Sequence, residues 1–130
     1  VAYFCHVDKE SCVSSSFILG KAKVAPAHGH TIPRLELCAA VLATELVQVV
    51  CEQLDVDPAT IHYHTDSNVI LKYICNKVRR FYVYVWNRVD RILNVSKPTQ
   101  WAHISTDKNP ADIGTRCIEA DKLTGSLWLA

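Results

Sequence analysis

The sequence contains no methionine, few glycines and no long apolar run, and each absence narrows the class of protein. Four glycines and five prolines among 130 residues exclude a collagen-like or low-complexity chain. No stretch approaches the roughly 20 apolar residues that span a bilayer, and no secretory signal opens the chain. Because the chain starts at Val1, within a predicted strand, we expect it to be a piece of a longer protein.

The charge and the cysteines also exclude several classes. The formal net charge is only +1, so any basic surface for nucleic acid must be local. The six cysteines lack the paired spacing of a zinc site or of a disulfide-rich secreted domain, which favours a reducing intracellular compartment. With 49% hydrophobic and 21% charged residues, we expect a single compact domain over residues 1–130.

Hydrophobic patterning predicts a mixed α/β domain without internal repeats. Strands are predicted at residues 1–7, 12–25, 61–65 and 100–105, with a turn at 8–11. Helices are predicted at residues 34–54, from Asp66 or Ser67 as the cap through Cys75, at 79–95, and from Asn109 onward. The predicted order of elements is therefore β-β-α-β-α-α-β-α.

Glu36 is the first of three carboxylates whose positions need a physical reason. At roughly 100° per residue, Glu36 lies about 180° from Glu45, which shares a solvated stripe with Gln48 and Glu52. Glu36 should then point to the apolar side of its helix, where a carboxylate is costly unless it is paired or binds a metal. Two interpretations stay open: a metal ligand, or a carboxylate that pairs with Arg34 or reaches solvent at the helix end.

Asp66 and Asp112 each lie where a strand or loop meets a helix. Asp66 follows a predicted strand, at a junction where α/β domains collect ligands, although it could equally cap the next helix. Asp112 follows the predicted Asn109 cap and Pro110, where the helix dipole alone would justify an acidic residue. Three carboxylates converging from separate elements would repel each other without cations between them. Magnesium suits such oxygen ligands, and two ions about 4 Å apart support phosphodiester hydrolysis.

Several motifs resemble, in order, the ribonuclease H-like region of Pao/BEL-type long-terminal-repeat retrotransposons. The resemblance covers almost the whole chain. The motifs are KVAP at 23–26, IPRLELCAA at 32–40, TDS at 65–67, WAHI at 101–104, NPAD at 109–112 and SLW at 126–128. His64 stands where the family usually has tryptophan.

This resemblance implies a ribonuclease H-like fold, a mixed sheet flanked by helices, in which four acidic residues hold two magnesium ions. Three of them correspond to Glu36, Asp66 and Asp112 as catalytic metal ligands, and manganese is the expected substitute metal. The fourth would lie on a first strand before Val1, which this chain lacks, so that residues 1–7 and 12–25 form the second and third strands. We therefore expect an N-terminally truncated domain, and whether it is an active enzyme stays open.

The implied activity is hydrolysis of the RNA strand of RNA–DNA hybrids during reverse transcription. The alternative is a catalytically inactive module that binds nucleic acid or spaces neighbouring polyprotein domains. Expected partners are the hybrid and the adjoining reverse transcriptase and integrase regions, without a membrane. The expected location is intracellular, in the cytoplasm and in virus-like particles.

The predicted helix at residues 79–95 combines arginines with aromatic residues, a combination that suits a phosphate backbone and its sugars. The candidate nucleic-acid contacts are Arg80, Tyr84, Arg88 and Arg91. The alternative is an ordinary solvated face of an amphipathic helix whose apolar side packs inside. The residues expected on that apolar side are Phe81, Val85, Val89 and Ile92.

Overall fold

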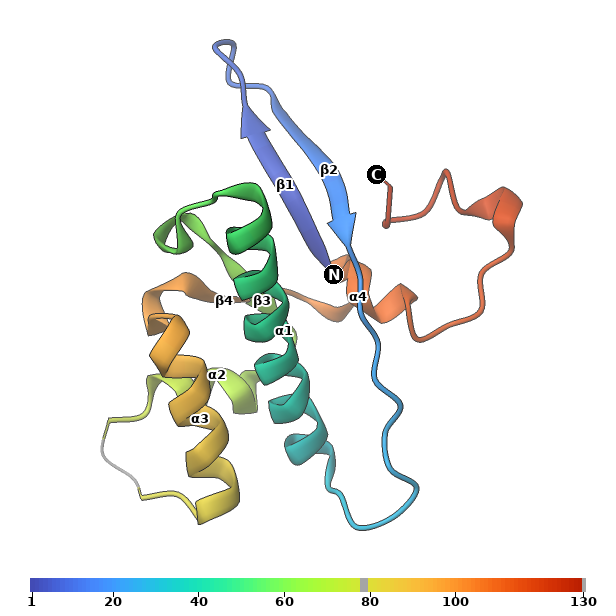
Figure 1. The fold of residues 1–130 in the computed structure, drawn as a ribbon. Coiled ribbons are helices and arrows are strands. Elements are labelled where there is room, and N and C mark those ends of the chain that lie inside the picture. The colour runs from blue at the N-terminus through green and yellow to red at the C-terminus, as the bar shows by residue number, and fades with distance from the viewer. Residues whose placement is uncertain (78–79, 130) are drawn as a thin grey trace. The chain divides into compact units, whose positions relative to one another are not determined.

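The computed structural model describes residues 1–77 and 80–129. Its strands and α-helices follow the predicted order β-β-α-β-α-α-β-α (Figure 1). The described part of the chain is mixed α/β, with two small sheets and four α-helices. It divides into two compact units, one formed by residues 1–23 and 106–130 and the other by residues 24–105. The single-domain organisation stays a prediction.

The unit of residues 24–105 contains three of the helices and the parallel sheet. Its elements are α1 (Ile32–Leu54), β3 (Tyr63–Thr65), α2 (Asn68–Cys75), α3 (Val83–Val95) and β4 (Trp101–His103). Figure 1 shows α1 and α3 side by side, in keeping with their extensive contacts. Apolar side chains from all three helices and both strands form one core: Leu37, Ala40, Val41, Tyr63, Ile70, Ile74, Val89, Ile92 and Trp101.

Helix α1 starts and stops at recognisable positions. It begins at Ile32, two residues before the predicted start, with Thr31 at the cap position and Pro33 in the first turn. Thr31 makes no side-chain capping hydrogen bond. The helix ends where Asp55 adopts the left-handed conformation (φ 53°), and the Asp55 N–H donates to the Cys51 carbonyl. The predicted polar stripe is confirmed, since Glu45, Gln48 and Glu52 are all exposed.

Strands β3 and β4 pair in parallel, with Tyr63 opposite Trp101 and Thr65 opposite His103. The rings of Tyr63 and Trp101 stack with centroids 4.6 Å apart and planes 9° from parallel. Strand β4 is shorter than the predicted 100–105. Its start is limited by a 3-10 turn at Pro98–Gln100, in which the Gln100 side chain donates to the carbonyls of Pro58 and Ile61.

Three other predicted boundaries are wrong. Strand β3 begins at Tyr63 and not at residue 61. Strand β2 (Val13–Leu19) ends well before residue 25, because Leu19 already pairs with Ala2, the first residue of its partner β1 (Ala2–Val7). Helix α3 begins at Val83, so Arg80 precedes the helix and does not lie on a helical face with Arg91. The chain before α3 instead places the Phe81 ring against Tyr73 of α2, with centroids 5.2 Å apart. The predicted helix start at Arg79 lies outside the described residues.

The unit of residues 1–23 and 106–130 contains the hairpin β1–β2 and the short helix α4 (Pro110–Ile113). The predicted turn is confirmed: the Asp8 carboxylate accepts from the N–H groups of Glu10 and Cys12. Trp128 packs against Phe17, with ring centroids 5.1 Å apart, and its carbonyl accepts from the Tyr3 hydroxyl at 2.9 Å.

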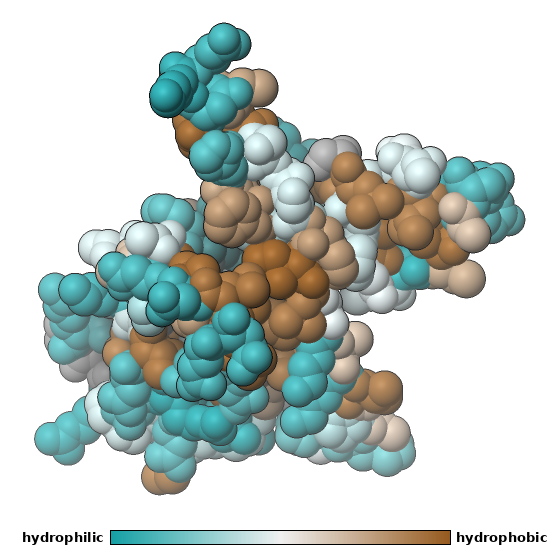
Figure 2. All heavy atoms as spheres, turned by 45° about the horizontal axis from the view of Figure 1, so that its top comes forward, coloured by the Kyte–Doolittle hydropathy of each residue, from teal (hydrophilic) through white to brown (hydrophobic). Residues whose placement is uncertain are grey.

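The hairpin also exposes apolar side chains. Figure 2 shows apolar surface on the hairpin below its hydrophilic tip. Among the residues of the hairpin, Phe4, Val7 and Val13 are exposed. No helix in the ranges 1–77 and 80–129 has the length and apolar character to cross a membrane.

Candidate active site

Glu36 lies in the second turn of α1 and faces the start of α2. Its carboxylate accepts a hydrogen bond from the Ser67 hydroxyl, with Oγ and Oε2 2.6 Å apart. The side chain is half-buried, as the helical angle predicted. The alternative pairing with Arg34 is wrong, because the Arg34 guanidinium lies over the Tyr84 ring, 4.7 Å from its centroid. Glu36 is therefore held on the side of α1 that faces the β3–α2 junction.

Ser67 forms the N-cap of α2 and orients Glu36 at the same time. Its Oγ accepts from the Ile70 N–H at 3.4 Å, and its own N–H donates to the Thr65 hydroxyl at 3.1 Å. The residue is buried, which restricts its hydroxyl to these partners. Of the two predicted caps, Ser67 and not Asp66 serves α2, so capping does not account for Asp66.

Glu36 and Asp66 belong to the same unit, and both adjoin Ser67. Glu36 accepts a hydrogen bond from the Ser67 hydroxyl, and Asp66 precedes Ser67 in the chain. Asp66 is half-buried at the carboxyl end of β3. Carboxylates are hard oxygen ligands, and magnesium is commonly held by one or two of them together with substrate phosphates. The donor type thus fits magnesium. The role of Ser67 in orienting Glu36 was not predicted from the sequence. The position of Ser67 directly after the candidate ligand Asp66 was the signal that could have indicated it.

Asp112 lies in the other unit, in the first turn of α4. Asn109 caps this helix, as predicted, by accepting from the Ala111 N–H at 3.1 Å. Arg116 forms an ion pair with the Asp112 carboxylate, with Nη2 and Oδ2 2.7 Å apart. Among the described residues, no group of three or more His, Cys, Asp or Glu side chains is arranged to hold a metal ion. Convergence of Asp112 with Glu36 and Asp66 therefore stays a prediction.

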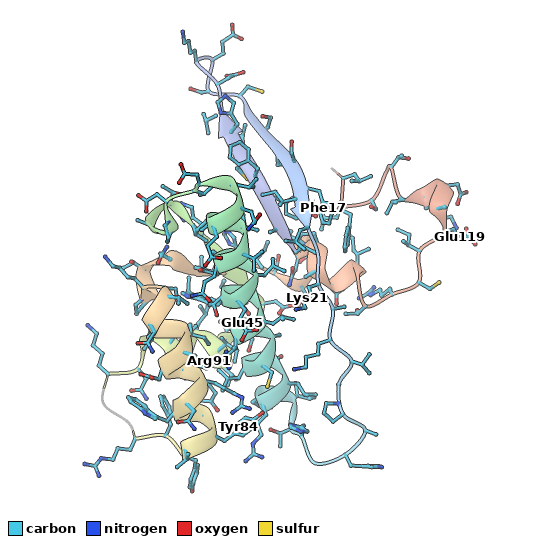
Figure 3. All side chains as sticks on the ribbon, viewed as in Figure 1. Phe17, Lys21, Glu45, Tyr84, Arg91 and Glu119 are labelled. Atoms are coloured by element: carbon cyan, nitrogen blue, oxygen red, sulfur yellow. The ribbon has the colours of Figure 1, made fainter. Side chains whose placement is uncertain are left out.

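The four predicted nucleic-acid contacts have different surroundings. Arg88 lies over the Tyr84 ring, with its guanidinium carbon 3.5 Å from the centroid, and donates to the Tyr84 carbonyl at 3.1 Å. Arg91 forms an ion pair with Glu45 of α1; the two side chains point toward one another in Figure 3. Arg80 is exposed before α3. The predicted packing of the apolar side is confirmed: Val89 and Ile92 are core residues, and Phe81 and Val85 pack against the core.

The Tyr84 hydroxyl is also fixed. It lies 3.2 Å from the Cys38 sulfur, within hydrogen-bonding distance, on the face of α1 that Arg34 shares. This hydrogen bond and burial raise the pKa of Tyr84, while the positive charges of Arg88 and Arg34 act in the opposite direction. The Tyr84 ring thereby connects the N-terminal parts of α1 and α3.

One comparison with known proteins supports the resemblance seen in the sequence. A family model described as a Pao retrotransposon-like RNaseH-like domain matches residues 1–67, slightly more than half of the chain. The match defines the class as ribonuclease H-like. The chain belongs to the Pao retrotransposon family of such domains. The matched range includes Glu36 and Asp66, whereas Asp112 lies beyond it. No curated protein and no solved structure matches the chain.

Proposed function

We propose that this domain hydrolyses the RNA strand of RNA–DNA hybrids in a reaction that requires magnesium, with manganese as a substitute. The observation that carries the proposal is the hydrogen bond from Ser67 to Glu36. This hydrogen bond holds the Glu36 carboxylate beside Ser67, the residue that follows Asp66. The chain also belongs to a ribonuclease H-like family. A carboxylate that follows β3 and a second carboxylate hydrogen-bonded to the next residue suit a divalent metal and the phosphate that it binds.

Each residue has a defined part in this proposal. Glu36 and Asp66 would be metal ligands, and Asp112 would join them as the third catalytic carboxylate. Bound magnesium would supply activation of the attacking water and stabilisation of the leaving oxygen. Ser67 would keep the Glu36 carboxylate oriented, because its hydroxyl is fixed at the N-terminus of α2.

Recognition of the hybrid would depend on the shape and backbone of the duplex, as is usual for A-form nucleic acid. The contacts proposed from the sequence are Arg80, Tyr84, Arg88 and Arg91. The proposed setting is a retroelement polyprotein with adjoining reverse transcriptase and integrase regions, acting in the cytoplasm and in virus-like particles.

A second candidate function is a module without catalysis that binds nucleic acid or spaces its neighbours. The ion pair between Asp112 and Arg116 favours it, since an arginine already occupies one of the proposed metal ligands. The two functions make opposite predictions for cleavage of the hybrid.

The deciding experiment measures cleavage of an end-labelled RNA–DNA hybrid with magnesium, with manganese and with chelator. The protein is assayed as the 130-residue chain and within the proposed retroelement polyprotein. Asp66→Asn should lower the cleavage rate by at least roughly 100-fold, because it removes a charged metal ligand. Asp90→Asn is the matched control, since Asp90 is an exposed residue of α3 that contacts Asn94.

Metal-dependent cleavage that Asp66→Asn abolishes and Asp90→Asn preserves would support the nuclease. A folded polyprotein that leaves the hybrid intact under every metal condition would overturn it in favour of the inactive module.

A further inference from the structure

Two arginines from different helices share one aromatic ring. Arg34 near the start of α1 and Arg88 of α3 place their guanidinium carbons 4.7 and 3.5 Å from the centroid of Tyr84. Both distances lie within the range of a cation–π interaction. In Figure 3, Tyr84 lies near the N-terminal end of α3, on the side of α1. Arg34 was not among the nucleic-acid contacts predicted from the sequence.

No carboxylate of the described residues forms an ion pair with either arginine. Within the described residues, Arg91 pairs with Glu45 and Arg116 pairs with Asp112, whereas Arg34 and Arg88 have no ion pair. Two cations close together repel each other, and a cation–π contact offsets only part of that cost. Arg34 is exposed and Arg88 half-buried, so an anion from solution can reach the pair.

The ring and one arginine are held in place before any ligand binds. The Tyr84 hydroxyl contacts Cys38 on α1, and the Tyr84 carbonyl accepts one N–H of Arg88. A guanidinium carries five N–H donors, so most of those on Arg88 remain for a ligand. The fork of donors matches the oxygens of a phosphate. Preorganised donors of this kind lose less conformational freedom on binding.

We propose that Arg34 and Arg88, positioned by Tyr84, bind the phosphodiester backbone of the nucleic acid. The identity of this ligand rests on the proposed function. Arg34 precedes Glu36 by two residues, roughly 200° around α1, so the arginine pair and the Glu36–Ser67 contact occupy different sides of the helix. Variants of the arginine pair therefore leave the candidate metal ligands untouched.

The test measures binding of a fluorescein-labelled RNA–DNA hybrid by anisotropy in chelator, at several salt concentrations. The double variant Arg34→Gln/Arg88→Gln should raise the Kd on the order of tenfold. It should also lower the slope of log Kd against log salt by about 2, since two phosphate contacts are lost. Lys72→Gln/Lys97→Gln is the control, because it changes the charge equally at exposed positions of the same unit. It should change Kd by less than about twofold.

Three further variants separate charge from positioning. Tyr84→Leu should raise the Kd severalfold with the salt slope unchanged, because both guanidiniums stay but lose their platform. Tyr84→Phe keeps the ring but loses the contact with Cys38, so its Kd should lie between those of the wild type and Tyr84→Leu. Arg34→Lys/Arg88→Lys keeps both charges but loses the fork of donors, so the salt slope should be retained while the Kd rises severalfold. A wild-type Kd in this variant would count against the site, which keeps the test available if the glutamine variants fold poorly. Far-ultraviolet circular dichroism and thermal unfolding establish folding for each variant.

The outcomes are distinguishable from those of the cleavage assay, because binding is measured without metal. Wild-type Kd and salt slope in a folded Arg34→Gln/Arg88→Gln protein would overturn the phosphate site, whether or not the hybrid is cleaved. A wild-type protein that does not bind the hybrid at low salt would overturn it as well. Loss of binding in this double variant, together with absent cleavage, would support the site within a module without catalysis.

Discussion

At the start of α2, one hydroxyl serves two structures. Ser67 Oγ accepts from the backbone N–H of Ile70 and donates to the Glu36 carboxylate. The cap stabilises α2, and the bond to Glu36 connects α2 to α1. A serine can do both because its hydroxyl has one donor and two acceptor positions. The orientation of Glu36 therefore depends on the same atom that begins the neighbouring helix.

Replacing this serine should lower the stability of the protein. Ser67→Ala removes the cap and leaves a half-buried carboxylate without its donor, so the free energy of unfolding should fall by about 1–3 kcal/mol. Urea unfolding followed by circular dichroism measures the change. Ser67→Thr is the control, because it keeps a hydroxyl at the cap. Equal stability of the alanine variant and the wild type would show that neither the cap nor the hydrogen bond to Glu36 stabilises the protein.

The Asp112–Arg116 pair gives a separate prediction, which rests on the proposed function. If Asp112 is a metal ligand, Arg116 competes with the metal for its carboxylate. Arg116→Gln should then lower the magnesium concentration for half-maximal cleavage by roughly two- to fivefold, the scale of a solvent-exposed ion pair. Lys122→Gln, which removes a different exposed ion pair in the same unit, should leave this concentration unchanged. An unchanged magnesium requirement in Arg116→Gln would count against Asp112 as a ligand.

For single residues, the sequence predicts the side of a helix on which a side chain lies better than it predicts the residues that the side chain contacts. The helical angle between Glu36 and Glu45 predicted correctly that Glu36 turns away from the polar stripe. It could not identify Ser67 as the donor, because that contact joins residues 31 positions apart. The arginine pair was missed for the same reason: Arg34 and Arg88 meet at Tyr84 only when α1 packs on α3.

Among the elements, the short parallel pair β3–β4 depends on its side chains. Each strand has only three residues, but the stacked rings of Tyr63 and Trp101 cover the start of both. The Trp101 indole N–H donates to Ser96 Oγ at 2.9 Å, which ties β4 to the end of α3. Burial raises the pKa of the Tyr63 phenol, and the negative charge of ionised Cys51 raises it further.

The raised pKa makes this sheet sensitive to alkaline pH. The folded state favours the neutral phenol, so the contribution of Tyr63 is complete below its unfolded pKa of about 10 and is lost as pH rises through the higher folded pKa. Tyr63→Phe keeps a ring for the stack and cannot ionise. Between pH 9 and pH 11, its free energy of unfolding in the same urea assay should therefore fall less than that of the wild type. This pH window is set by the ordinary tyrosine pKa of about 10.

The matched control for this pH series is Tyr82→Phe, because Tyr82 is 89% exposed before α3. This variant should follow the wild-type dependence on pH. Parallel curves for Tyr63→Phe and the wild type would show that another group controls alkaline unfolding.

The order of elements could be predicted from the sequence because periodicity and caps are local properties. Ser67 and Asn109 start their helices as the capping rules expect. The ends of β2 and β4 could not be predicted in this way. The last residue of β2 is set by a partner strand whose first residue is Ala2, and the first residue of β4 by a 3-10 turn that Gln100 fixes to residues 58 and 61. Strand length is thus decided by tertiary contacts that no local pattern contains.

In the whole molecule, burial is distributed unevenly between the two units. Every hydrophobic side chain counted as buried in the described residues belongs to the unit of residues 24–105. In the other unit, the hairpin β1–β2 exposes apolar residues such as Val7 and Val13, at 59% and 66%. A two-stranded hairpin with little buried apolar area is marginally stable in water. The hairpin should therefore open more readily than the helices.

Native-state hydrogen exchange measures this difference directly. Backbone amides in α1 and α3 should exchange only through global unfolding, whereas amides of β1 and β2 should exchange through local opening that requires a smaller free energy. Trp128 contacts the ring of Phe17 and accepts from Tyr3, so Trp128→Ala should speed exchange in the hairpin further and leave α1 and α3 unchanged. Equal protection of the hairpin and α1 in the wild-type protein would instead mean that both units unfold as one cooperative body.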